Sequence, residues 1–159
     1  MADKTIVMDS GPLILLAKID ALSILEKLNL KYVAPTVVQE ELAAGPRFGH
    51  PQVNVPWLSF QSTSEPVPSY IRATLDDGEA AVIWLALERG IGHVCLDDRR
   101  GRRMAKALGL EVVGLLGLLV RAKRQGHITT LRSYTTDLLA VGARYTPKLI
   151  AEVLESVGE

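Results

Sequence analysis

Short apolar runs without a helical period alternate with helical segments along this chain, and this alternation constrains its fold most strongly. The runs that predict strands are 5–8, 32–34, 93–96 and 111–113, with one further extended piece over 57–61. No hairpin signal of the Asn-Gly kind separates them, so crossover helices are expected between parallel strands. We therefore expect an α/β protein, a three-layer α/β/α sandwich in which helices cover both faces of a central parallel sheet.

Apolar residues at spacings of three and four predict the helices. The expected helices are 12–18, 22–28, 36–44, 77–89, 99–108, 115–123, 130–141 and 148–156. Ser10 is the expected N-cap of the first helix, because Pro12 suits the first helical position. The five prolines between 45 and 68 mark a surface excursion rather than a domain boundary. One domain over 1–159 is expected.

Composition excludes several classes of protein. The 18 Lys and Arg residues balance the 18 Asp and Glu residues, so the chain is neither a polycationic coat nor an acidic tail. The longest uncharged apolar run, 112–120, is far shorter than the roughly 18 to 20 residues of a membrane span. The N-terminus does not read as a secretory signal, and we expect a cytoplasmic protein. With Cys95 as the one cysteine, a Cys/His zinc site has no ligand set, so any metal would be bound by oxygen.

Acidic residues follow two predicted strands directly. Asp9 comes after the first strand, and Asp97 and Asp98 come after the strand at 93–96. Ligands of a parallel sheet bind beyond the carboxyl ends of its strands, which makes these acids candidates for a functional site. Helix capping is the competing interpretation of each acid. Neighbouring residues point in different directions, so we expect one of the pair to share a site with Asp9 and favour Asp98.

Two glutamates are expected to point inward. On the helix from Thr36, Glu41 shares a face with Val37 and Val38, while Glu40 lies roughly opposite. On the helix from Asp77, Glu79 lies in line with the apolar face. A buried carboxylate needs a cation, a hydrogen-bond donor or a metal beside it. The alternative to a ligand role is an ion pair with an arginine of the segment 99–103.

Four inward acids at one end of a sheet favour a metal site over four separate ion pairs. The set is Asp9, Glu41, Glu79 and either Asp97 or Asp98. Carboxylates that crowd together stay ionised only around divalent cations, and oxygen-rich sites of this kind suit Mg²⁺ or Mn²⁺. The chemistry that such a site favours is phosphodiester hydrolysis by activated water. The Ser10 hydroxyl could hold a water or a phosphate there.

The residues around these acids resemble a known family. The stretches 7–14, 35–42, 77–86 and 96–99 are similar to the four successive signatures of PIN-domain proteins, and 109–126 resembles a branch of PIN-like nucleases. The resemblance implies a parallel sheet between helices and a metal-dependent ribonuclease, often the toxin of a toxin-antitoxin pair. It also implies a small antitoxin partner and a homodimer. In the pattern of the family, Asp9, Glu41, Glu79 and the acid at 97 or 98 bind the metal.

A basic region follows the expected site. Between 90 and 132 the chain carries nine basic and three acidic residues, a local charge of +6. Arg99, Arg103 and Lys106 share one helix face and are candidates for contacts with the phosphates of an RNA substrate. Ion pairs on a solvated helix face are the competing interpretation. Two other functions remain open, an inactive nucleic-acid- or protein-binding module and, with less support, a phospho-accepting receiver domain.

Overall fold

Five parallel strands form the sheet in the computed structural model, which describes residues 4–159. The strands are β1 (Thr5–Met8), β2 (Lys31–Pro35), β3 (Leu58–Gln61), β4 (His93–Cys95) and β5 (Glu111–Val113). Their order is β3-β2-β1-β4-β5, which places β1 at the centre and makes β3 and β5 the edges. The predicted α/β class and the parallel sheet are therefore confirmed.

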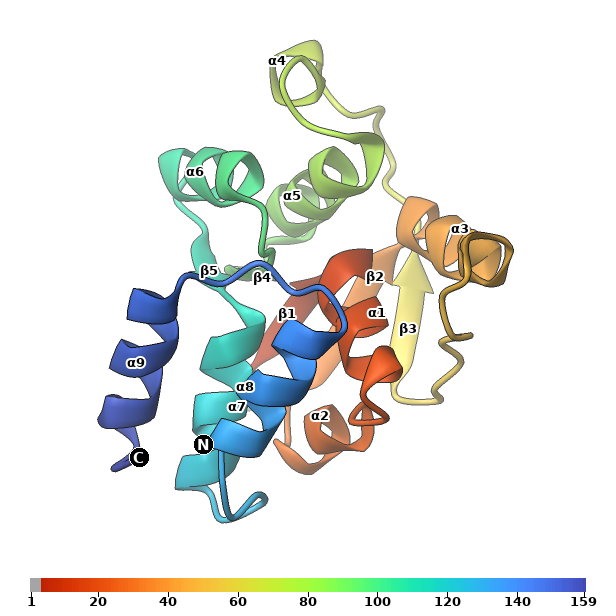
Figure 1. Cartoon of the computed structure of the whole chain (residues 1–159). Helices are drawn as coiled ribbons and strands as arrows, with labels where there is room; N and C mark the ends of the chain where they lie inside the picture. The colour runs from red at the N-terminus through yellow and green to blue at the C-terminus, as the bar shows by residue number, and fades with distance from the viewer. Residues whose placement is uncertain (1–3) are drawn as a thin grey trace.

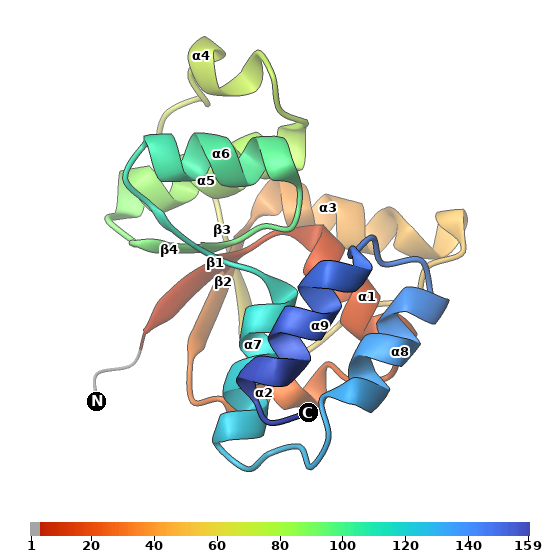
Figure 2. The ribbon, with the colours of Figure 1, turned by 60° about the vertical axis from the view of Figure 1, so that its left-hand side comes forward.

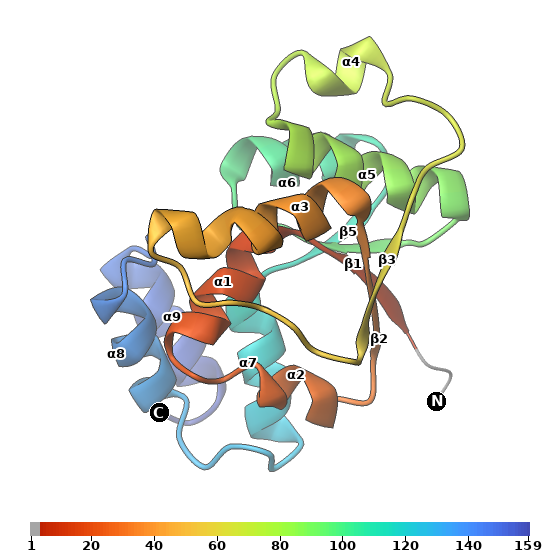
Figure 3. The same cartoon turned by 90° about the vertical axis from the view of Figure 1, so that its right-hand side faces the viewer.

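Helices cover both faces of this sheet, as predicted (Figures 1 and 2). One layer holds α5 (Asp77–Arg89) and α6 (Arg99–Ala107), with the short α4 (Ser69–Arg72) against α5. The opposite layer holds α1 (Ser10–Lys18), α2 (Ser23–Lys27), α7 (Leu115–Arg124), α8 (Arg132–Ala140) and α9 (Pro147–Ser156). Helix α3 (Thr36–Ala44), followed by a 3-10 turn over Gly45–Phe48, contacts both α1 and α5. Figure 3 shows α3 crossing between the two layers.

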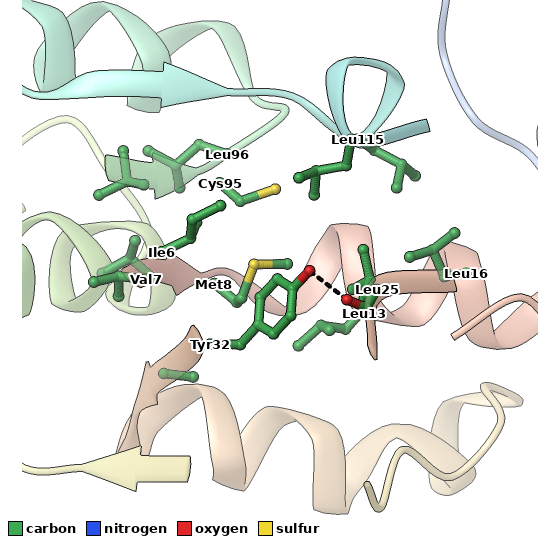
Figure 4. Packing of buried hydrophobic residues seen from close by; sticks show 14 of the residues in the cluster. Ile6, Val7, Met8, Leu13, Leu16, Leu25, Tyr32, Cys95, Leu96 and Leu115 are labelled. Carbon is green, nitrogen blue, oxygen red and sulfur yellow. Dashed lines mark hydrogen bonds between the residues drawn. The ribbon is translucent and has the colours of Figure 1, made fainter. Parts of the chain in front are cut away.

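The central strand β1 is buried on both faces, which explains its uninterrupted apolar sequence. Ile6, Val7 and Met8 are each at most 1% exposed. Figure 4 shows these side chains packed among residues of α1, β4 and α7. The Tyr32 hydroxyl donates to the Leu25 carbonyl at 2.6 Å, so its polar atom is satisfied inside this core.

The first helix begins earlier than predicted. Helix α1 starts at Ser10, and Asp9 is its N-cap, because the Asp9 carboxylate accepts a hydrogen bond from the Ser10 amide at 2.8 Å. The expectation that Ser10 caps this helix was therefore wrong. The sequence alone did not separate the two, since Asp and Ser are both good caps and Pro12 is tolerated anywhere in the first turn.

The proline-rich segment contributes more to the sheet than predicted. Its extended piece is β3, which pairs with β2 in parallel as an edge strand. The 3-10 turn at 45–48 and helix α4 were not predicted, because each is a single turn without a readable period. Within residues 4–159, no helix combines the length and the apolar character needed to cross a membrane.

Candidate functional site

The candidate site lies where the strand order of the sheet reverses, at the carboxyl ends of β1 and β4. These two strands are neighbours, although a long stretch of chain separates them. The Asp9 amide donates to the Cys95 carbonyl at 3.2 Å, so the segment after β1 is held against the end of β4. This position brings Asp9 close to Asp97, and it is where parallel α/β sheets bind ligands.

Glu41 reaches this end of the sheet from α3. The Ser10 hydroxyl donates to Glu41 Oε2 at 3.3 Å. The Glu41 carboxylate also lies over Gly78 in the first turn of α5, where a Cβ atom would overlap Glu41 Oε1. Glu41 is exposed, like Glu40, which differs from the inward position expected from its helical phase, but its carboxylate is directed at Ser10 and Gly78.

Glu79 approaches from the first turn of α5 and is 8% exposed. Burial, followed by the neighbouring charges of Asp76, Asp98 and Asp9, raises the pKa of Glu79 to about 8. Burial also raises the pKa of Asp9, to about 7, and the charges of nearby carboxylates add to this increase. The hydrogen bond from the Ser10 amide acts in the opposite direction and lowers the pKa. These carboxylates therefore repel one another in one partly desolvated region.

The pKa values of Glu41 and Asp97 are raised as well, that of Glu41 by burial and a neighbouring charge and that of Asp97 by burial. Burial and then the Asp76 charge raise the pKa of Glu41. Burial raises the pKa of Asp97, while the Leu115 amide and the Arg102 guanidinium oppose the change. The Leu115 amide donates to Asp97 Oδ1 at 3.2 Å. Asp97 Oδ2 is buried and meets no donor in good hydrogen-bond geometry within the described residues, although the Tyr145 hydroxyl lies near enough to lower the pKa of Asp97.

Three helix N-termini lie beside these acids and offset part of the repulsion between their carboxylates. Asp9 caps α1, Asp76 caps α5 and Asp98 caps α6. Asp98 Oδ2 accepts from two backbone amides, that of Arg100 at 2.9 Å and that of Gly101 at 3.3 Å. The positive ends of the helix dipoles and these amides partly offset the repulsion. Asp98 thus borders the site while one of its oxygens is engaged in capping.

The ion-pair interpretation of Glu79 has no support. Among residues 4–159, neither ion pair found joins Glu79 to an arginine. Arg102 Nη1 instead donates to the Leu96 carbonyl at 2.9 Å and lies beside Asp97. These residues fit a hard divalent cation, because they supply several crowded carboxylates. One of their oxygens, Asp97 Oδ2, is buried and has no donor in good hydrogen-bond geometry among the described residues. Within the described residues, however, no three acids, His or Cys side chains are placed close enough to hold one ion.

Two residues near the acids were missed from the sequence. Asp76 accepts from the Glu79 amide at 2.8 Å, and its charge acts on Asp9, Glu41 and Glu79. Its place directly before a predicted helix start was a readable capping signal. Tyr145, from the connection between α8 and α9, has its hydroxyl buried near Asp97. No local pattern in the sequence indicated that contact.

Arg99, Arg103 and Lys106, the three predicted phosphate contacts, all lie on α6, but only Arg99 lies near the acids. Arg99, in the first turn of α6, lines a groove that also contacts Asp97 and Asp98. Arg103 and Lys106 are exposed further along the helix and do not line that groove. Arg99 is therefore the member of this set that the structure places beside the acids.

Gly78 gives the site a specific test. Gly78→Ala places a methyl group where the Glu41 carboxylate now lies, so that flexible side chain must swing away. The free energy of unfolding is expected to stay level or rise by about 0.5–1 kcal/mol, because Ala is the better helix former. Affinity for Mn²⁺ is expected to fall about tenfold or more, measured by isothermal titration calorimetry.

Gly101→Ala is the matched control for this substitution. A Cβ at Gly101 meets Glu79 and Leu96 atoms at 3.6–3.7 Å, which is ordinary contact, so Mn²⁺ affinity is expected to remain unchanged. Equal Mn²⁺ affinities in the Gly78 and Gly101 variants would show that the position of Glu41 over Gly78 is irrelevant to the site.

Comparisons with known proteins agree with this architecture. A family model described as a PIN domain matches residues 5–159. The fold is similar to that of a PilT N-terminus domain protein from the hyperthermophilic archaeon Sulfolobus solfataricus P2, with a TM-score of 0.56 and 18% sequence identity. That similarity covers 74% of this chain and 92% of the archaeal one. The comparison with curated proteins finds no match.

Proposed function

Because the chain belongs to the PIN-domain family, we propose that it is a Mg²⁺- or Mn²⁺-dependent ribonuclease that hydrolyses phosphodiester bonds of RNA. The observation that carries the proposal is the group of mutually repelling carboxylates at the β1–β4 crevice. They come from separate elements and lack a cationic partner among the described residues, apart from Arg102 beside Asp97. Carboxylates whose pKa values are shifted, and which gather beyond the carboxyl ends of parallel strands, indicate a functional site.

The residues that would hold the ion are Asp9, Glu41, Glu79, Asp97 and Asp98. When bound, the ion would supply a Lewis acid for a phosphoryl oxygen and lower the pKa of a coordinated water. The Ser10 hydroxyl orients the Glu41 carboxylate through its hydrogen bond. Arg99, Arg103 and Lys106 are the proposed contacts to substrate phosphates, where they attract the RNA backbone without moving a proton.

The proposal extends to partners. The resemblance to PIN-domain toxins supports a small antitoxin protein as one partner and a second copy of the chain as another. One observation favours the alternative of a catalytically inactive PIN-like module that binds nucleic acid or protein. In the described part of the structure, no three potential ligands converge on a single point.

Cleavage of labelled RNA tests the proposed function. Purified protein is incubated with single-stranded and structured RNA in Mg²⁺ or Mn²⁺, and products are resolved on denaturing gels. We expect cleavage that excess chelator abolishes and added metal restores. Metal-independent cleavage, or folded protein that binds RNA but never cleaves it, would contradict the proposal and favour the inactive module.

The two neighbouring glutamates of α3 provide a matched pair. Glu41→Gln is expected to weaken Mn²⁺ binding and slow cleavage by about tenfold or more, because Glu41 faces Ser10 and Gly78. Glu40→Gln is expected to leave both unchanged, because Glu40 is exposed on the other side of the helix. Calorimetry and the RNA assay measure the pair. Equal losses would mean that general surface charge, not the position of Glu41, accounts for metal binding.

A further inference from the structure

The Asp97 carboxylate is enclosed by groups from several elements of the fold. Its Oδ1 atom accepts from the Leu115 amide at 3.2 Å, at the N-terminus of α7. Gly114 packs against the same carboxylate, since a Cβ atom there would lie 3.4 Å from Asp97 Oδ1. Arg102 lies beside Asp97 but donates to the Leu96 carbonyl at 2.9 Å. These contacts orient one oxygen of Asp97 and leave the buried Oδ2 atom without a donor.

The Tyr145 hydroxyl is the group placed to serve this second oxygen. Asp97 Oδ2 and the Tyr145 hydroxyl are both buried, and within residues 4–159 neither has a partner in good hydrogen-bond geometry. The two side chains line the same groove, and each acts on the pKa of the other. A buried hydroxyl and a buried carboxylate oxygen are each unfavourable when unpaired, and one charge-assisted hydrogen bond between them satisfies both.

Tyr145 reaches Asp97 from the connection between α8 and α9. Figure 1 shows this connection passing near the ends of β4 and β5. At the other end of the helix pair, the Glu159 carboxylate accepts from the amides of Leu131 at 2.6 Å and Arg132 at 3.1 Å, where α8 begins. The start of α8 and the segment after α9 are thus tied together, which restrains the connection that carries Tyr145.

We infer that Tyr145 is a positioning residue for Asp97: its hydroxyl donates to Asp97 Oδ2 and orients this carboxylate toward the divalent cation. The inference rests on the proposed metal-dependent function. A carboxylate has about four lone-pair sites, so the Leu115 and Tyr145 donors leave Asp97 positions with which to bind an ion. Burial and then the Asp97 charge raise the pKa of Tyr145, so the hydroxyl keeps the proton that it donates. The C-terminal helices thereby contribute to the metal site.

Removal of the hydroxyl alone tests the inference. Tyr145→Phe keeps the ring and its packing, and Mn²⁺ affinity is expected to fall about tenfold, as is typical when a group that orients a metal ligand is lost. Free Mn²⁺ is measured by electron paramagnetic resonance, and circular dichroism confirms the fold. Tyr134→Phe is the matched control, because Tyr134 is a partly buried tyrosine of α8 that does not line the groove with Asp97. The control is expected to keep the parent affinity.

A double-mutant cycle with Asp97→Asn separates positioning from a general structural role. If Tyr145 acts through Asp97, Tyr145→Phe should cost no more than about twofold in Mn²⁺ affinity once Asp97 is already Asn. An undiminished loss in that background would overturn the inference, because the effect of Tyr145 would not pass through Asp97. Equal affinities in the Tyr145 and Tyr134 variants would also overturn it. A higher affinity in Tyr145→Phe would do the same, since the hydroxyl would then compete with the ion for Asp97 Oδ2.

Metal binding and cleavage separate this inference from the proposed function. If the parent cleaves RNA and binds Mn²⁺, but Tyr145→Phe binds Mn²⁺ equally well, the ribonuclease stands and the role of Tyr145 fails. If Mn²⁺ affinity depends on Tyr145 through Asp97 but the parent cleaves no RNA, the role of Tyr145 stands and the ribonuclease proposal fails. A folded parent that binds no Mn²⁺ would overturn the metal site and, with it, this role.

Discussion

Asp9→Asn is expected to reduce metal-dependent RNA cleavage by about 100-fold or more while the protein remains folded. Even residues that only support metal ligands change activity by about 10–100-fold, and Asp9 is proposed as a ligand itself. The helix cap survives, because Asn retains a side-chain oxygen that can accept from the Ser10 amide. A fluorogenic RNA assay in Mn²⁺ measures cleavage, and circular dichroism confirms the fold.

Asp20→Asn is the control for this substitution. Asp20 is exposed, and its left-handed backbone conformation (φ 55°) accommodates Asn, so cleavage should be unaffected. Cleavage by Asp9→Asn at the rate of the Asp20 control would remove Asp9 from the proposed metal site. A parallel loss in both variants would point to general charge effects.

Metal-free protein is expected to lose stability as the pH rises from 5 to 8. The pKa values of Asp9 and Glu79 are raised in the folded state, to about 7 and about 8. Between their unfolded and folded pKa values the folded protein binds more protons than the unfolded chain, so the free energy of unfolding falls as pH increases. We expect a loss of about 2 kcal/mol over this window after allowance for solvent screening, equivalent to about 4–8 °C in Tm.

Two comparisons test this assignment by thermal melting. Asp9→Asn should melt higher than the parent at pH 8 without metal and should show a weaker pH dependence, because one repelling charge is gone. Mn²⁺ should raise the Tm of the parent more at pH 8 than at pH 5.5, since the ligands must be deprotonated to bind it. A metal-free Tm that rises from pH 5 to 8 would contradict the account.

Local patterns in the sequence predict most of this architecture. The helix predicted over 77–89 matches α5 at both ends, because Asp76 and Gly90 terminate it with strong cap conformations. Helical phase also distinguished Glu41 from Glu40 on the helix from Thr36, although the contact of Glu41 with Ser10 was not predicted. These features depend on the chain within a few residues, which is the range over which periodicity and capping act.

Contacts between distant segments could not be predicted in this way. The proximity of Tyr145 to Asp97 depends on how α9 is placed beside α7, which no local rule determines. The influence of Asp76 on Glu41 depends on the packing of α3 against α5. The choice between Asp97 and Asp98 likewise depended on tertiary structure, which gives Asp97 the Leu115 amide and uses Asp98 to cap α6.

Titration of the metal-free protein with Mn²⁺ at pH 8 in a calorimeter tests the central claim most directly, because the claim is that these acids form a divalent-metal site. We predict saturable binding with proton release, strongly weakened in Glu79→Gln and unchanged in Glu40→Gln. Folded parent protein that shows no saturable Mn²⁺ binding, or that binds Mn²⁺ as tightly after Glu79→Gln as before, would contradict it.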